Sequence, residues 1–260
     1  REKVLKMIRT RKPLFVIGSP PCTRWCAWQN INDRKRDPEV IKFEQEKAEV
    51  HLKFSAQVYR EQIEGGRFFL HEHPDSAGSW SEECIEELME IESVSRVCAD
   101  QCQYGQQSSN GNPVRKSTGW MSNSPEILKK LERRCLGRRG DCSRPGGGRH
   151  QTASGRTARE AAIYPFKLCR AILEGCRDQL GRDGNLHDGA HGFQGLFDEV
   201  CAQSSQHFCY DAATGEMLNG DAGVAVAKVF SLTAPETVYT DSVTGQPLEA
   251  ALVPIASTLL

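Results

Sequence analysis

Two segments of the chain carry residue types that suit nucleophilic and acid–base chemistry. The first is Ser-Pro-Pro-Cys-Thr at 19–23, which contains Cys22, and the second is His-Glu-His-Pro at 71–74, which contains Glu72. A cysteine thiol can add to an electron-poor carbon, and a carboxyl group can neutralise the charge that this addition creates. The double proline stiffens the loop because it fixes two backbone angles and removes two amide donors. The alternative is a rigid turn that holds a half-buried, unreactive thiol.

A strand–helix–strand pattern positions these two segments. The apolar runs at 14–17 and 67–71 have the continuous hydrophobicity of buried parallel strands. Between them, Asp37-Pro38 is typical of a helix start and opens a long amphipathic stretch. Reactive groups in an open parallel sheet gather beyond the carboxyl ends of the strands. We therefore expect Cys22 and Glu72 to lie close together at one sheet edge.

The alternation of strands and helices continues to about residue 180. Further expected elements are a helix from Ser79 or Ser81 to about Val94, a strand at 97–103, a helix opened by Ser124-Pro125 and a helix from Pro165 to Leu180. The predicted fold class is α/β, with a partial Rossmann-like sheet of parallel strands and crossover helices. Residues 181–260 predict an irregular connector. Within it, 210–215 and 239–245 echo each other, either as a duplicated turn or as two unrelated turns.

The two segments resemble the catalytic motifs of the cytosine C5 DNA methyltransferases, in which Pro-Cys follows one strand and a glutamate ends the next. That resemblance implies that Cys22 adds to C6 of a flipped-out cytosine and that Glu72 holds or protonates the ring near N3. S-adenosylmethionine would supply the methyl group. By the same resemblance, the residues that contact the substrate would be Pro21, Thr23, Tyr104, Arg115 and Lys116.

The chain also departs from that family. Thr23 stands where the family has glutamine, and His73-Pro74 replaces Asn-Val after the glutamate. Ahead of Cys22 the sequence has no glycine-rich cofactor loop and no acidic strand end, so we expect an incomplete S-adenosylmethionine site and a degenerate or incomplete activity.

A second resemblance accounts for this incompleteness. The motifs Ser-Pro-Pro-Cys-Thr, Phe-Phe-Leu-His-Glu-His-Pro, Tyr-Gly, Asn-Ser-Pro and Ala-x-x-Tyr-Pro resemble a methyltransferase-like segment of copia-type retrotransposon polyproteins. It implies a methyltransferase-like domain at 1–180 and a connector at 181–260 that leads toward a reverse transcriptase. The rest of such a polyprotein would then be a partner of this chain.

One region of the chain is strongly basic. Between Lys129 and Arg159 there are ten lysines and arginines but only two acidic residues. Candidates for contact with a nucleic-acid backbone are Arg138, Arg139, Arg144 and Arg149. The alternative is a solvated loop without a partner. If the loop binds nucleic acid, DNA first of all, the chain can be a non-catalytic nucleic-acid-binding module instead of a methyltransferase.

Cysteine and histidine residues raise the question of a metal. Cys135, Cys142 and His150 share the basic loop, and Cys98 and Cys102 lie upstream. Such ligands suit zinc, but their spacing fits no standard finger. We therefore expect ordinary core and loop cysteines and no metal site, and a zinc-stabilised structural domain stays as the alternative. For the two histidines beside Glu72 we expect packing and hydrogen-bonding roles.

The overall composition restricts the kinds of partner and the location that we expect for the chain. The net charge of −1 indicates no global attraction to nucleic acid or to membranes, and no apolar run approaches the length of a membrane span. The first residues indicate a charged helix rather than a signal sequence. We expect an intracellular protein without a membrane partner, located in the nucleus if it acts on DNA.

Overall fold

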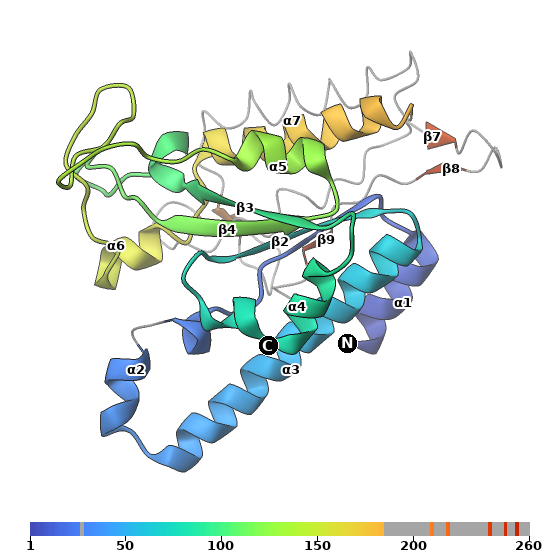
Figure 1. Ribbon diagram of the computed structural model, residues 1–260, viewed down its shortest axis with the longest axis horizontal. Coiled ribbons are helices and arrows are strands. Elements are labelled where there is room, and N and C mark those ends of the chain that lie inside the picture. Colours follow the sequence, from blue (N-terminus) through green and yellow to red (C-terminus); the bar gives the residue numbers. More distant parts are fainter. Residues whose placement is uncertain are drawn as a thin grey trace.

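Helices cover both faces of a central sheet (Figure 1). The computed structural model describes residues 1–26 and 29–184 and the backbone of five two-residue strands between Cys209 and Pro254. The helices are α1 (Glu2–Arg11), α2 (Gln29–Asn32), α3 (Pro38–Glu64), α4 (Glu83–Met89), α5 (Pro125–Leu131), α6 (Gly155–Glu160) and α7 (Phe166–Arg182). The strands of the central sheet are β1 (Phe15–Gly18), β2 (Phe68–Pro74), β3 (Ser95–Asp100), β4 (Ser117–Ser122) and β9 (Val253–Pro254). The class is therefore α/β, as the alternation predicts.

The strand order is β3-β4-β2-β1-β9. β1 and β2 are parallel neighbours, with Phe15 opposite Phe68 and Gly18 opposite His71. This confirms the predicted strand–helix–strand unit, in which α3 forms the crossover. β4 is antiparallel to both β2 and β3, so the expectation of a wholly parallel sheet is wrong. A parallel return needs a crossover, usually a helix, whereas only the 3-10 turn η4 (Gln101–Tyr104) lies between β3 and β4.

Most of the predicted helix starts agree with the structure. The Asp37 side chain accepts a hydrogen bond from the Glu39 amide, and Ser124 accepts one from the Ile127 amide, so both cap their helices. Pro165 directly precedes α7. The helix expected from Ser79 or Ser81 to Val94 is instead a 3-10 turn, η3 (Gly78–Ser81), followed by the short α4. Neither serine caps α4, because both lie in η3 and the residue at the N-cap position of α4 is Glu82.

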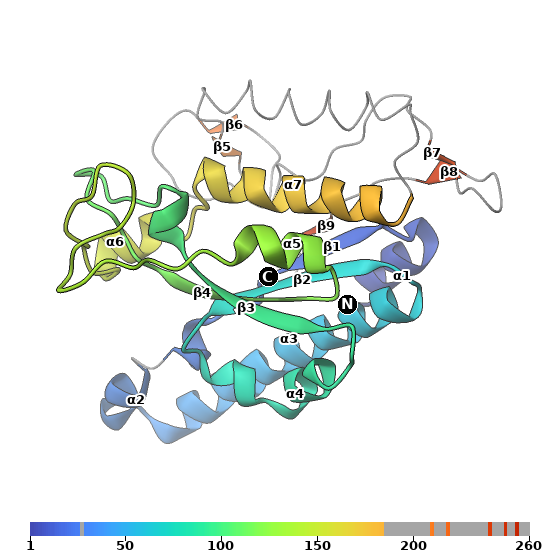
Figure 2. The ribbon, with the colours of Figure 1, turned by 45° about the horizontal axis from the view of Figure 1, so that its top comes forward.

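Two hydrophobic cores hold the helical layers against the sheet. α1, α3 and α4 pack on one face, where Leu52 and Tyr59 of α3 contact Phe69 of β2 among other buried residues. α5 and α7 pack on the other face around Trp120 of β4 and Ile172 of α7. Figure 2 shows the sheet between these two layers. The loops that follow β1 and β2 therefore extend from a sheet that is packed on both faces.

The C-terminal stretch is described only in part. Cys209–Tyr210 pairs with Met217–Leu218, and Tyr239–Thr240 pairs with Pro247–Leu248, so each echoed segment begins in a two-stranded antiparallel pair. β9 adds to the free edge of β1 in parallel. The rest of the predicted connector, 181–260, lies outside the described residues beyond Gly184.

Within the described part of the chain, no helix combines the length and the apolar character that crossing a membrane requires.

Candidate functional site

Cys22 lies four residues beyond the end of β1, and Glu72 lies in β2 close to its carboxyl end, where its charge acts on the Cys22 thiol. The Glu72 carboxylate is 5% exposed, and its Oε2 atom accepts a hydrogen bond of 2.5 Å from the Ser19 hydroxyl. Its Oε1 atom lies 3.8 Å from Lys116 Nζ and has no hydrogen-bond partner although it is buried. A buried carboxylate oxygen without a hydrogen bond can accept one from a ligand. The arrangement therefore offers a thiol and a free acceptor side by side.

The double-proline loop is fixed from the neighbouring strand. His73 Nε2 lies 3.0 Å from the Pro20 carbonyl oxygen, which can only accept, so this nitrogen donates. His73 Nδ1 then accepts from the Ser79 hydroxyl. Together with the bond between Ser19 and Glu72, these contacts fix the backbone directly before Cys22.

The two histidines of β2 point away from Glu72, as the alternation along a strand predicts. His71 Nδ1 lies 2.9 Å from the Tyr59 hydroxyl, and both histidine rings pack against Trp80. Burial lowers the pKa of His71 well below its usual value and also lowers the pKa of His73. Both rings are therefore neutral at pH 7 and have packing and hydrogen-bonding roles.

The Cys22 thiol is held in its neutral form. Burial raises its pKa above the ordinary value, and the negative charge of Glu72 raises it further, while Lys116 lowers it. The Glu72 carboxylate therefore lies within electrostatic reach of the thiol. At neutral pH the site therefore contains a protonated thiol beside an acceptor that can take its proton.

Tyr164 is a part of this site that the sequence did not single out. Its hydroxyl interacts electrostatically with Ser19 and Glu72, and burial raises its pKa well above the usual range. Lys116 Nζ lies 5.7 Å from the centre of the Tyr164 ring. The tyrosine comes from the segment just before α7, far along the chain from β1 and β2. The one signal was its place in the Tyr-Pro motif.

The residues expected to contact a substrate separate into three groups. Pro21 and Thr23 are exposed on either side of Cys22, and Lys116 contacts Glu72. Tyr104 is buried away from the pair, and its hydroxyl donates to the Lys130 carbonyl oxygen. Arg115 pairs with Asp100 instead of reaching the thiol.

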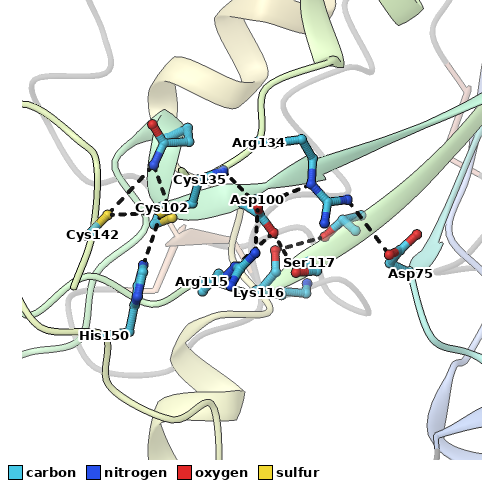
Figure 3. Close-up of polar contacts among 12 residues, drawn as sticks. Asp75, Asp100, Cys102, Arg115, Lys116, Ser117, Arg134, Cys135, Cys142 and His150 are labelled. Atoms are coloured by element: carbon cyan, nitrogen blue, oxygen red, sulfur yellow. Dashed lines mark hydrogen bonds and ion pairs between the residues drawn. The ribbon is translucent and has the colours of Figure 1, made fainter. Parts of the chain in front are cut away.

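Asp100, at the end of β3, joins several segments. Its carboxylate is fully buried and accepts hydrogen bonds of 2.5 Å from the Ser117 hydroxyl and 2.8 Å from the Cys135 amide. Arg115 Nε and Arg134 Nε lie at 3.4 and 3.3 Å (Figure 3). Burial opposes the charge of Asp100, but the hydrogen bonds from Ser117 and the Cys135 amide outweigh it and lower the pKa. The carboxylate therefore stays ionised and fixes the start of the basic loop to the sheet.

Four of the five candidate metal ligands come together beside Asp100. The ligand atoms of Cys102, Cys135, Cys142 and His150 all lie within 4.8 Å of one another. Figure 3 shows these side chains converging from η4 and from the basic loop. Cys98 is not among them, because its thiol is hydrogen bonded to Asp75. The cysteines of the described residues are free thiols.

The structure also distinguishes among the arginines of the basic loop. Arg144 is used inside the loop, where it donates to the carbonyl oxygens of Gly111 and Gly147. Arg138, Arg139 and Arg149 are exposed, and no carboxylate of the described residues pairs with them. These three side chains are free to contact a polyanion.

Comparisons with known proteins identify no relative, since no family model, no curated protein and no solved structure matches the chain. Both resemblances therefore remain predictions.

S-adenosylmethionine does not fit the residues described. Its binding loop in Rossmann-like folds is glycine-rich and follows a strand. None of the strands β1 to β4 is followed by such a loop, and the loop after β1 is occupied by the double proline. The glycines at 146–148 lie in the basic loop and follow no strand.

Proposed function

We propose that Cys22 and Glu72 act as a nucleophile and proton carrier on the pyrimidine ring of cytosine in nucleic acid, as the resemblance to cytosine C5 methyltransferases implies. The observation that carries the proposal is the buried Glu72 Oε1, which lacks a hydrogen bond and belongs to a carboxylate whose charge acts on the Cys22 thiol. Leaving a buried acceptor unsatisfied costs about 1–3 kcal/mol. A ring N–H or amino group placed against Oε1 would remove that cost.

The addition step balances with the groups that the site contains. The Cys22 sulfur forms a bond to C6, the C5–C6 π electrons move to C4–C5, and the N3–C4 double bond opens. The proton that leaves the thiol passes to Glu72 and from there to N3. The product is an enamine in which C5 is nucleophilic, and no outside oxidant or acid is needed.

The groups around Cys22 and Glu72 support proton transfer from the thiol to the carboxylate as the sulfur attacks. A thiol whose pKa is raised needs a base when it attacks, and the adjacent carboxylate is that base. Lys116 stabilises the carboxylate before proton transfer. Ser19 holds the other carboxylate oxygen, so that Oε1 alone is directed to the ring.

Methyl transfer from S-adenosylmethionine to C5 would follow the addition step in the methyltransferases that the chain resembles. Because the described residues do not form a binding loop for that cofactor, we derive no methyl-transfer step and base the test on the addition step alone.

Tritium exchange reports the addition without a methyl donor. In the adduct, C5 of [5-³H]cytosine takes a proton from water, and elimination of the thiol then releases tritium. We expect release from single-stranded or duplex DNA with the wild-type chain and none above background with Cys22→Ser. Cys26→Ser is the matched control, because it removes a neighbouring partly buried thiol. Absence of release from the wild-type chain, or equal release from Cys22→Ser, overturns the proposal.

A second candidate function, non-catalytic nucleic-acid binding, rests on the three unpaired arginines. Each lysine or arginine that neutralises a phosphate adds close to one unit to the slope of log affinity against log salt. Neutralising Arg138, Arg139 and Arg149 to alanine should therefore reduce this slope by about two to three units. The control changes Lys129, Arg156 and Arg170, each paired with a glutamate on its own helix, to alanine. An equal loss of binding in both variants would leave only nonspecific charge attraction.

A further inference from the structure

We propose that Cys102, Cys135, Cys142 and His150 bind one structural zinc ion, which holds the basic loop against the sheet. Three sulfur atoms and one imidazole nitrogen converge on one point (Figure 3). This set is closed, because four protein ligands leave no coordination position for water or substrate, which is typical of structural zinc. The inference does not depend on the cytosine chemistry proposed above.

Two of the separations between ligand atoms match those of a tetrahedral zinc site, and the remaining ones are within 4.8 Å. Bond lengths of about 2.3 Å for Zn–S and about 2.0–2.1 Å for Zn–N place two sulfurs about 3.8 Å apart, and a sulfur and a nitrogen about 3.6 Å apart. The observed separations are 3.9 Å between Cys135 Sγ and Cys142 Sγ and 3.6 Å between Cys135 Sγ and His150 Nε2. A disulfide would require about 2.05 Å between the sulfurs. The geometry thus matches a shared ion rather than a covalent bridge.

Hydrogen bonds around the sulfurs have the pattern found around metal thiolates. The Ser143 amide donates to Cys135 Sγ at 3.4 Å, and the Arg144 amide donates to Cys142 Sγ at 3.5 Å. Gln103 Nε2 donates to Cys102 Sγ at 3.4 Å. Such donors orient the ligands and stabilise their negative charge. A cluster of thiols that were merely packed together would not need an amide directed at each sulfur.

The loop is long and has no regular secondary structure of its own. Residues 132–154 connect α5 to α6 without a helix or named strand, which exceeds the roughly 12–15 residues typical of such loops. Two backbone hydrogen bonds, from Cys142 to Gly148 and from His150 to Gly140, bring the third and fourth ligands together. At Gly137 a side chain would meet the Asp141 carbonyl oxygen at 1.8 Å, so the backbone turns back here as tightly as it can. A metal cross-link would add to these hydrogen bonds by joining the loop to Cys102 of η4.

Zinc is the ion that these ligands favour. Three soft thiolates with one imidazole select against magnesium and calcium, which prefer oxygen. Three thiolates on one divalent ion leave a net negative charge. Arg115 and Arg134, which pair with the neighbouring Asp100, supply positive charge close to it.

Metal analysis of the full chain, expressed with zinc in the medium and purified under reducing conditions, is the first test. We expect one zinc per chain and three thiols that become reactive only after chelation. Cobalt substituted for zinc should give the strong visible absorption of tetrahedral thiolate coordination together with sulfur-to-cobalt charge transfer. Zinc well below one per chain, or the weak absorption of octahedral cobalt, overturns the proposal.

Substitutions locate the site. Cys142→Ser should lose most of the bound metal, whereas Cys98→Ser, which removes a thiol outside the cluster, should retain it. Because Cys142→Ser can also fail to fold, His150→Cys provides a second readout. It should retain the metal and raise the cobalt charge-transfer intensity by about one third, as four thiolates replace three. Unchanged metal content in Cys142→Ser, or an unchanged cobalt spectrum in His150→Cys, overturns the assignment.

Discussion

The two oxygens of Glu72 have different surroundings. Oε2 is held by the Ser19 hydroxyl, whereas Oε1 has only the Lys116 ammonium at 3.8 Å, beyond hydrogen-bond distance. A carboxylate fixed on one side and open on the other has a defined direction in which it can accept a proton. The neutral Cys22 thiol lies within its electrostatic reach. These surroundings are the ones that the proposed proton transfer between the two groups requires.

Opposite charges next to Cys22 predict opposite effects on its alkylation. Glu72→Gln removes the negative charge that raises the Cys22 pKa, so the pKa should fall and alkylation by iodoacetamide at pH 8 should be several-fold faster. Lys116→Met removes the charge that lowers this pKa, so alkylation should be slower. Rates for each cysteine, measured by peptide mass spectrometry from pH 7 to 10, test both signs. Equal rates in the two variants would mean that these charges do not act on the thiol.

Among the helices and strands, the sequence predicted the features that depend on residues close together along the chain. The sequence predicted the helix caps at Asp37 and Ser124 and the apolar strands β1 and β2, because each of these features depends on residues that are neighbours in sequence. The direction of β4 was not, since a strand's hydrophobic pattern is the same in either orientation.

The candidate sites show the same division. The proximity of Cys22 and Glu72 followed from the rule for parallel strand ends, but Tyr164 joins them only through the packing of α7. The sequence named the four cysteine and histidine residues of the cluster but could not show that they meet, because Cys102 comes from η4 and its partners from a distant loop, so their spacing fits no standard zinc motif.

The contact between α5 and α7 predicts a cost for a single methyl group. A Cβ atom at Gly175 of α7 would lie 2.6 Å from Ile127 Cα of α5, so Gly175→Ala must push the two helices apart. Overpacking costs about 1–3 kcal/mol, while alanine regains about 1 kcal/mol of helix propensity. We expect a net loss of up to about 2 kcal/mol in the free energy of unfolding, measured by urea denaturation. Gly78→Ala is the control, because its Cβ would meet nothing closer than 3.9 Å.

At the scale of the molecule, the carboxyl ends of β1, β2 and β3 point to one edge of the sheet. They carry Cys22, Glu72 and Asp100 respectively, and the antiparallel β4 begins at the same edge. Arg115 and Lys116, the two residues just before β4, divide between these sites, since Arg115 pairs with Asp100 and Lys116 pairs with Glu72. The start of β4 therefore links the basic loop to the site of Cys22 and Glu72.

Asp100→Asn tests this link. The amide keeps the shape of the carboxylate but loses its charge, so the hydrogen bonds from Ser117 and the Cys135 amide weaken and Arg115 and Arg134 lose their buried partner. Breaking one partner of a buried charged network costs about 3–5 kcal/mol, and the exposure of both arginines places the expected loss near the lower end, about 3 kcal/mol.

Limited proteolysis measures the local part of this loss. Arg138 and Arg139 are exposed trypsin sites in the middle of the loop. The Asn variant should be cut there many-fold faster than the wild-type chain under conditions in which both are folded by circular dichroism. Asp178→Asn, which removes the partner of Lys130 on the far side of α5, is the control and should leave cleavage at these arginines unchanged. If Asp100→Asn is cut no faster than this control, Asp100 does not fix the loop, because opening of the loop is what exposes its backbone to the protease.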